Sequence, residues 1–151
     1  MTDYNKFQRV GSEHNAGVGR LFEERVRDFF LKKGIDLKSG FAVPIGAAAD
    51  RKKLHKFDLG SDNPPILVEC KSHTWTQGGN MPSAKMTVWN EAMLYFLLTP
   101  AEFRKILFVL KHERTGQSLA AYYLQTHGHL IPDNVEIWEL DVDTGNATQL
   151  R

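Results

Sequence analysis

Three residues near the middle of the chain have side chains suited to metal-dependent hydrolysis: Asp58, Glu69 and Lys71. Glu69 and Lys71 close an apolar run at residues 66–71 that is typical of a strand, and residues two apart in a strand share a face. A turn-forming segment at residues 60–65 predicts a hairpin that brings Asp58 to this strand. If the turn is centred between residues 63 and 64, Asp58 lies opposite Glu69, with Cβ atoms about 4.5–5.5 Å apart. A register slip of one residue would turn Asp58 to the other face.

Two carboxylates in that relation repel each other, and a divalent cation between them removes the repulsion. Carboxylate oxygens together with retained waters are the ligands that Mg²⁺ prefers, with Mn²⁺ as a substitute. Such a metal lowers the pKa of bound water, and the Lys71 ammonium would stabilise the negative charge that develops during hydrolysis. The alternative is an exposed strand face on which Lys71 simply offsets the two acids.

Basic residues gather just before Asp58, where Arg51, Lys52, Lys53 and Lys56 fall within six positions. We expect them to form a loop that contacts phosphate groups, although a solvated surface loop is the commoner explanation of such a run. Lys85 lies in the first turn of a predicted helix for which Ser83 is the expected cap, and it is a further candidate for phosphate contact.

The composition fits one globular domain of 151 residues, with 42% apolar and 25% charged residues. A single cysteine excludes an internal disulfide and a cysteine-built zinc site, and it favours the cytoplasm. No apolar run approaches the roughly 18 residues of a membrane span, so no membrane partner is expected. The net charge of +1 combines −4 over residues 133–151 with +5 over residues 1–132, which hold 18 basic and 13 acidic side chains. A low total therefore does not exclude nucleic acid.

The elements that must position these side chains follow from periodicity. We expect a loose arm over residues 1–15, then a helix from an Asn15 cap to about residue 33, which Gly34 ends. A strand at 41–45 follows, and Pro44 places it at a sheet edge or a bulge. After the hairpin come a helix that ends by Pro100, apolar nearly all round, and an apolar strand at 106–110 typical of a central position.

A helix over residues 117–127 and an alternating, half-exposed edge strand at 135–140 complete the chain. The predicted fold is a single α/β domain with a mixed central sheet and helices on both faces. Its α-β-β-β-α-β core covers residues 16–112, and residues 113–151 add one helix and one strand.

The pattern resembles the PD-(D/E)xK nuclease superfamily, whose restriction-endonuclease-like core has the same α-β-β-β-α-β order. The resemblance is carried by Phe57-Asp58 and by Val68-Glu69-Cys70-Lys71, with ten residues between the two acids. It implies that Asp58 and Glu69 hold the metal, that the backbone carbonyl of Cys70 is a third ligand, and that Lys71 is the catalytic lysine. Phe57 stands where the name-giving proline would be, a position that often varies.

Many members of that superfamily also carry a glutamate on the first helix. Residues 19–26, followed by Phe29, Phe30 and Gly34, look like the Mrr-type restriction version of this helix. That likeness favours Glu23 over the adjacent Glu24 as an additional acid of the site.

The expected function is therefore a Mg²⁺-dependent endonuclease that cuts nucleic acid, first of all double-stranded DNA. Because two strands must be cut, we expect a symmetric homodimer, formed through the apolar second helix. A junction-type nuclease, a non-catalytic nucleic-acid-binding or assembly module with the same fold, and an unrelated α/β interaction domain are the alternatives. His73 and Trp75 are minor candidates for substrate contact.

Overall fold

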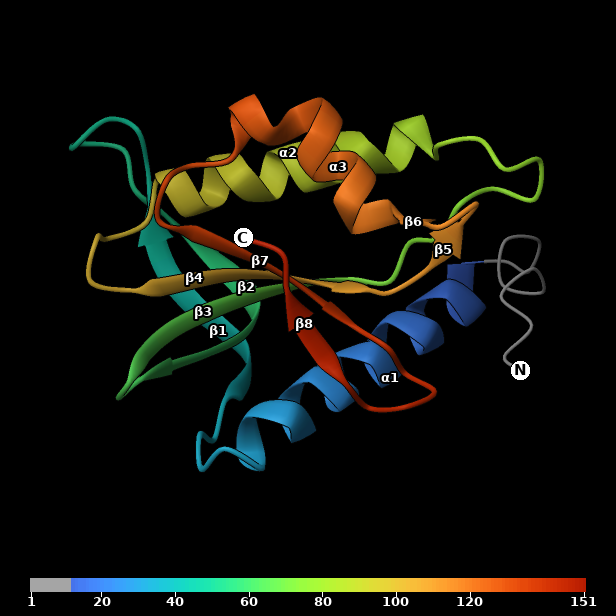
Figure 1. Ribbon diagram of the computed structural model, residues 1–151. Helices are drawn as coiled ribbons and strands as arrows, with labels where there is room; N and C mark the ends of the chain where they lie inside the picture. The colour runs from blue at the N-terminus through green and yellow to red at the C-terminus, as the bar shows by residue number, and fades with distance from the viewer. Residues whose placement is uncertain (1–11) are drawn as a thin grey trace.

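The computed structural model describes the backbone of residues 12–151 and the side chains from residue 17 onward. Its centre is a mixed six-stranded sheet in the order β1-β2-β3-β4-β7-β8 (Figure 1). The β3–β4 and β4–β7 pairs are parallel and the other pairs are antiparallel. The strands are β1 Lys38–Ile45, β2 Lys53–Asp62, β3 Pro65–Lys71, β4 Arg104–Leu110, β7 Val135–Leu140 and β8 Ala147–Gln149.

Helices cover both faces of this sheet, which confirms the predicted α/β class. Helix α1 (Ser12–Leu31) lies against one face, and α2 (Ser83–Leu97) and α3 (Leu119–His127) lie against the other (Figure 1). A 3-10 turn, Gly128–Leu130, extends α3, and a small hairpin of β5 (Glu113–Arg114) and β6 (Gln117–Ser118) precedes it. None of the described helices combines the length and apolar character needed to cross a bilayer.

Two hydrophobic cores fill the layers, one on each face. In the α1-side core, Phe22, Val26 and Phe30, spaced four residues apart on α1, pack with apolar side chains of the sheet such as Val68 and Phe108. Strands β3 and β4 contribute alternate side chains to both cores, which confirms that β4 is central.

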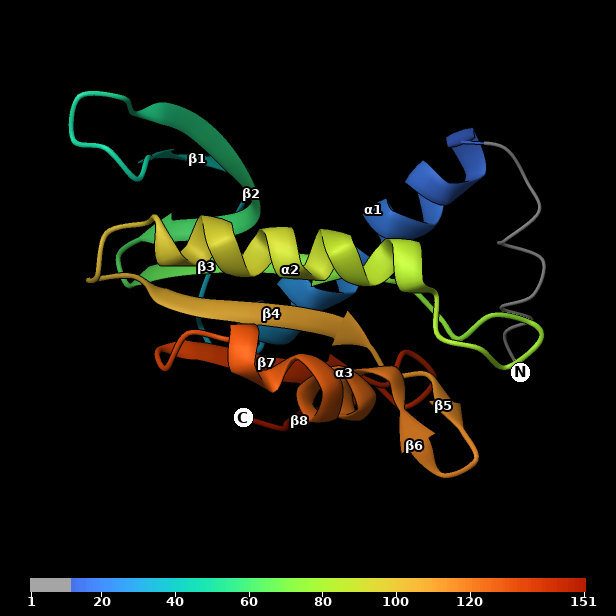
Figure 2. The same cartoon turned by 90° about the horizontal axis from the view of Figure 1, so that it is seen from above.

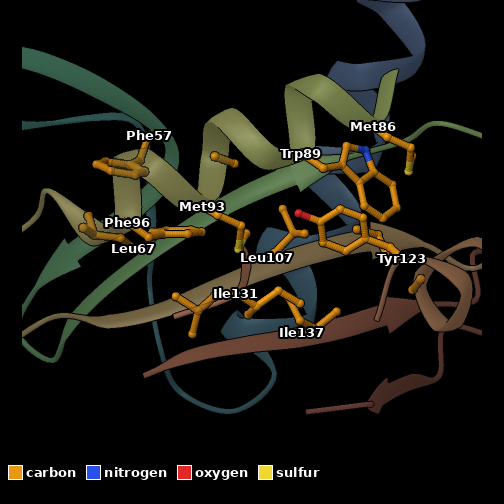
Figure 3. Packing of buried hydrophobic residues seen from close by; sticks show 14 of the residues in the cluster. Phe57, Leu67, Met86, Trp89, Met93, Phe96, Leu107, Tyr123, Ile131 and Ile137 are labelled. Carbon is orange, nitrogen blue, oxygen red and sulfur yellow. The ribbon is translucent and has the colours of Figure 1, made fainter. Parts of the chain in front are cut away.

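The α2-side core has large aromatic side chains at its centre. Phe57 stacks on Phe96 with ring centroids 5.6 Å apart, and Trp89 meets Tyr123 edge-on at 5.0 Å (Figure 3). All four residues are fully buried. Since Phe57 adjoins Asp58 in the chain, this packing fixes the strand that carries the predicted metal ligand.

Both predicted helix N-caps are wrong. Helix α1 begins at Ser12, so Asn15 lies inside it and residues 12–15 are not a loose arm; residues 1–11 lie outside the described part of the chain. The N-cap of α2 is Pro82, without a side-chain cap, and Ser83 is the first helical residue. Pro82 has a φ of −74°, which suits a helix start because its ring fixes φ in that region.

The strands differ from the prediction in the start of β2, in the length of the hairpin turn and in the place of β7, and they agree with it at Pro44. Strand β2 begins at Lys53, so the basic segment is only partly a loop, and the hairpin turn shortens to residues 63–64. Pro44 does lie on an edge strand, as predicted, because β1 ends the sheet. Strand β7 is not an edge strand: β8 pairs with it antiparallel and takes the edge. Neither β8 nor the β5–β6 hairpin is long enough to leave a sequence period.

Candidate active site

The hairpin register agrees with a turn centred between residues 63 and 64. Leu59 pairs with Val68, so one further step along the two strands places Asp58 across from Glu69. The regular ladder stops at Leu59, however. The site therefore lies where β2 and β3 cease to pair.

Strand β2 changes its side-chain alternation at Asp58. Leu59 packs in the α1-side core, whereas Phe57 packs in the α2-side core, although residues two apart in a regular strand share a face. Across from Asp58 on β1 lies Gly40, whose φ of +63° suits glycine and marks the same irregularity. As a result, the Asp58 side chain packs in neither of the two hydrophobic cores.

The Asp58 side chain accepts a hydrogen bond from the β3 backbone at the point where the β2–β3 backbone ladder stops. The Cys70 N–H donates to Asp58 Oδ2 at 2.7 Å, so the carboxylate lies beside the end of β3, between the positions of Glu69 and Lys71. A charge-assisted bond of this length holds the carboxylate firmly.

Glu69 and Lys71 lie together on the α2 side of β3. Glu69 is only 6% exposed. Its Oε2 accepts from Lys71 Nζ at 3.5 Å, and its Oε1 lies 3.2 Å from His55 Nε2. The shared face predicted from two-residue spacing is thus present, and the Lys71 ammonium is adjacent to a buried carboxylate.

Glu23 approaches this cluster from α1. It is half-buried, whereas the neighbouring Glu24 is exposed. Burial, and next the charge of Asp58, raises the pKa of Glu23 to about 7, and the charge of Lys71 lowers it. Glu23 is therefore partly buried and near enough to interact electrostatically with Asp58 and Lys71, whereas Glu24 is exposed.

Negative charge is crowded at this point of the molecule. Burial, and next the charge of Asp58, raises the pKa of Glu69 to about 8, while Lys71 acts in the opposite direction. A divalent cation would relieve this crowding, and the oxygen-only donors suit Mg²⁺ or Mn²⁺. Within the described residues no three His, Cys, Asp or Glu side chains form a metal cage. A bound ion would thus rely on Asp58 and Glu69 together with backbone oxygen and water.

Cys70 contributes only its backbone to this site. Its side chain packs against the α1-side core, on the face opposite Glu69. Burial first, and then the charges of Asp58, Glu23 and Glu69, raise the pKa of the Cys70 thiol, so a nucleophilic thiolate is strongly disfavoured.

The basic residues lie on the β1–β2 hairpin, before Asp58 in the chain. Arg51, Lys52, Lys53 and Lys56 are all exposed on the β1–β2 hairpin, and Lys52 Nζ donates to the Gly46 carbonyl at 3.3 Å. This hairpin and the N-terminal part of α1 both extend beyond α2 toward the same side (Figure 2).

Lys85 is exposed on the first turn of α2 and close enough to His73 to lower its pKa. His73 itself is anchored to α2, because the Trp89 indole N–H donates to its Nδ1 at 2.8 Å. Burial first, then the charges of Lys71 and Lys85, lowers the pKa of His73 to about 4, so it is neutral. Trp75 is buried in the α2-side core and does not present a surface to bases.

Sequence reasoning missed one residue that touches the cluster, His55, which lies within the basic segment between Lys53 and Lys56. Its contact with Glu69 spans 14 residues and depends on how β2 bends at Asp58. A hairpin register centred on residues 63–64 does not pair these two positions. The contact therefore could not be predicted from the sequence around them.

A scan against protein-family models finds no match, and searches of curated proteins and of solved structures find none either. The resemblance to PD-(D/E)xK nucleases therefore rests on the residues and on the element order.

Proposed function

We propose that the chain is a Mg²⁺-dependent endonuclease acting on nucleic acid, with double-stranded DNA as the first substrate to test. The observation that carries this proposal is the cluster of Asp58, Glu69 and Lys71 at the point where β2 leaves β3, with Glu23 of α1 near enough to interact electrostatically with Asp58 and Lys71. A structural sheet gains nothing from acids that repel each other, whereas a divalent metal for hydrolysis is held by such acids.

In this proposal each side chain has a separate role. Asp58 and Glu69 hold the metal, with the Cys70 carbonyl as a third protein oxygen, and Glu23 adds an acid from α1. Bound Mg²⁺ supplies a water of lowered pKa and polarises a phosphoryl oxygen. Lys71, adjacent to Glu69, directs its ammonium at the charge that develops on the phosphate oxygens. The cations on the hairpin and Lys85 hold neighbouring phosphates.

The test is incubation of the full chain with plasmid, linear, branched and single-stranded substrates, with and without Mg²⁺ or Mn²⁺. We expect metal-dependent cutting that falls by at least about 100-fold in Glu69→Gln, which weakens the hold on the metal, and in Lys71→Ala, which removes positive charge at the reacting phosphate. Glu113→Gln and Lys38→Ala change the same residue types at exposed positions away from the site and should cut like the wild type. Cutting that survives both site substitutions would contradict the proposal.

The substrate panel also separates the alternatives. Preference for branched over linear duplex would indicate a junction-type nuclease. Binding without cutting under all metal conditions would indicate a non-catalytic nucleic-acid-binding module.

A further inference from the structure

His55 contacts Glu69 from outside the acid–lysine cluster. Its Nε2 lies 3.2 Å from Glu69 Oε1, whereas Lys71 Nζ approaches the other oxygen, Oε2. The two oxygens of one buried carboxylate thus have different partners. This division fixes the rotation of the carboxylate about its terminal bond.

The imidazole of His55 is itself held in place by aromatic rings. It meets the Phe57 ring edge-on, with centroids 4.7 Å apart, and lies against Tyr95 of α2 at 4.0 Å and 30°. The Tyr95 hydroxyl in turn donates to Glu91 at 2.9 Å. Glu69 is therefore connected, through His55, to the helix on that face of the sheet.

We propose that His55 is a positioning residue for the metal-binding carboxylate. Its Nε2–H donates to Oε1 of ionised Glu69, so that Oε2 is presented toward Lys71 and the metal. The inference rests on the proposed function, because it assumes that Glu69 binds a cation. A hydrogen bond to the outer oxygen of a ligating carboxylate orients the ligand, and loss of such a partner costs 10–100-fold in metal affinity as a rule of thumb, that is, about 1.4–2.7 kcal/mol.

The experiment measures Mn²⁺ affinity of the full chain by electron paramagnetic resonance of the free ion, at one pH. His55→Leu keeps an apolar side chain against Tyr95 but has no donor, and His55→Ala removes the donor in a second way. We expect both to bind Mn²⁺ about 10–100-fold more weakly than the wild type. His55→Gln places an amide N–H donor near the position of Nε2, so its affinity should return to within about threefold of the wild type.

Matched controls separate this role from a loss of folding. His129 is exposed at the end of the α3 extension, so His129→Ala should bind Mn²⁺ like the wild type. Thermal melting of every variant shows whether the fold is kept. In cleavage assays, His55→Leu should need more Mg²⁺ for half-maximal rate and should regain most of the wild-type kcat at saturating Mg²⁺.

Different results would contradict the role of His55 and the proposed function. If the wild type binds Mn²⁺ and folded His55→Leu or His55→Ala binds it equally well, His55 does not position the ligand. Equal weakening in His55→Gln and His55→Leu would also overturn the inference, since the N–H would then be irrelevant. If the wild type itself shows no saturable Mn²⁺ binding, the proposed function fails and the inference falls with it.

Discussion

Glu69 is an acid buried in the layer between a sheet and a helix, and this placement has a thermodynamic consequence. Its pKa rises from 4.5 to about 8, mainly through burial and next through the charge of Asp58. Between these two values the folded chain holds a proton that the unfolded chain releases. The free energy of unfolding therefore decreases as pH rises through this window and levels off above it.

This dependence can be measured by urea unfolding in metal-free buffer from pH 6.5 to 8.5. We expect the wild type to lose stability over that range, by an amount on the order of 1–2 kcal/mol, and Glu69→Gln to lose much less. Saturating Mg²⁺ should make the unfolding free energy of the wild type depend less on pH, because the cation replaces the proton on Glu69. Starting at pH 6.5 avoids His73, whose lowered pKa gives the opposite slope between about pH 4 and 6.5. Parallel curves for the two proteins would contradict the assignment of this proton to Glu69.

At the scale of single residues, the sequence is informative where the chemistry is local. Asp58, Glu69 and Lys71 could be predicted because strand alternation and one turn relate them. Glu23 required the likeness of its helix to a known family, and the structure adds that Glu24 is exposed. His55 could not be predicted, since its contact with Glu69 follows from the change of alternation at Asp58, which packing in two cores imposes.

Among the elements, the β1–β2 hairpin carries the exposed cations. If these contact phosphates, the triple variant Arg51→Ala, Lys53→Ala and Lys56→Ala will bind duplex DNA more weakly. The slope of log affinity against log salt should become shallower by about 0.9 for each lost contact, and so by up to about three units. Fluorescence anisotropy without Mg²⁺, at 50–200 mM salt, measures both quantities.

The control for that experiment carries the same charge change elsewhere: Lys32→Ala, Lys33→Ala and Lys38→Ala alter exposed residues at the C-terminal end of α1 and the start of β1. If the slope of log affinity against log salt is unchanged in the hairpin variant, or changes equally in the control, the hairpin does not bind phosphate. Lys52 is left intact because it bonds to the Gly46 carbonyl and so supports the turn.

The order of the long elements could be predicted because each buries a periodic apolar face, as α1 does with Phe22, Val26 and Phe30. Helix starts could not, because capping depends on one residue and its backbone angles: Pro82 is the N-cap of α2, where Ser83 was expected. The edge strand β8 is only three residues long, which is too short for a period to be recognised in the sequence.

For the whole molecule, the expected homodimer requires a surface that two copies can share. Helix α2 is not buried all round: Val88, Leu94 and Leu97 are 39%, 52% and 63% exposed. If this face forms the dimer, the wild type will sediment as a dimer and Leu94→Glu with Leu97→Glu as a monomer. Leu31→Glu, at a 53% exposed leucine that ends α1, should leave the dimer intact. A monomeric wild type at tens of micromolar would contradict the expectation.

The side-chain alternation of β2 changes at Asp58, and the residues before and after this position differ in how freely they can be substituted. From Phe57 onward the strand is fixed by the two cores, and Gly60 cannot accept even a methyl group because the Phe41 ring covers it. Residues 47–54 are exposed, and of these Lys53 and Leu54 pair with β1. Selection, natural or in a randomised library, can therefore change residues 47–54 without disturbing the cluster of Asp58, Glu69 and Lys71.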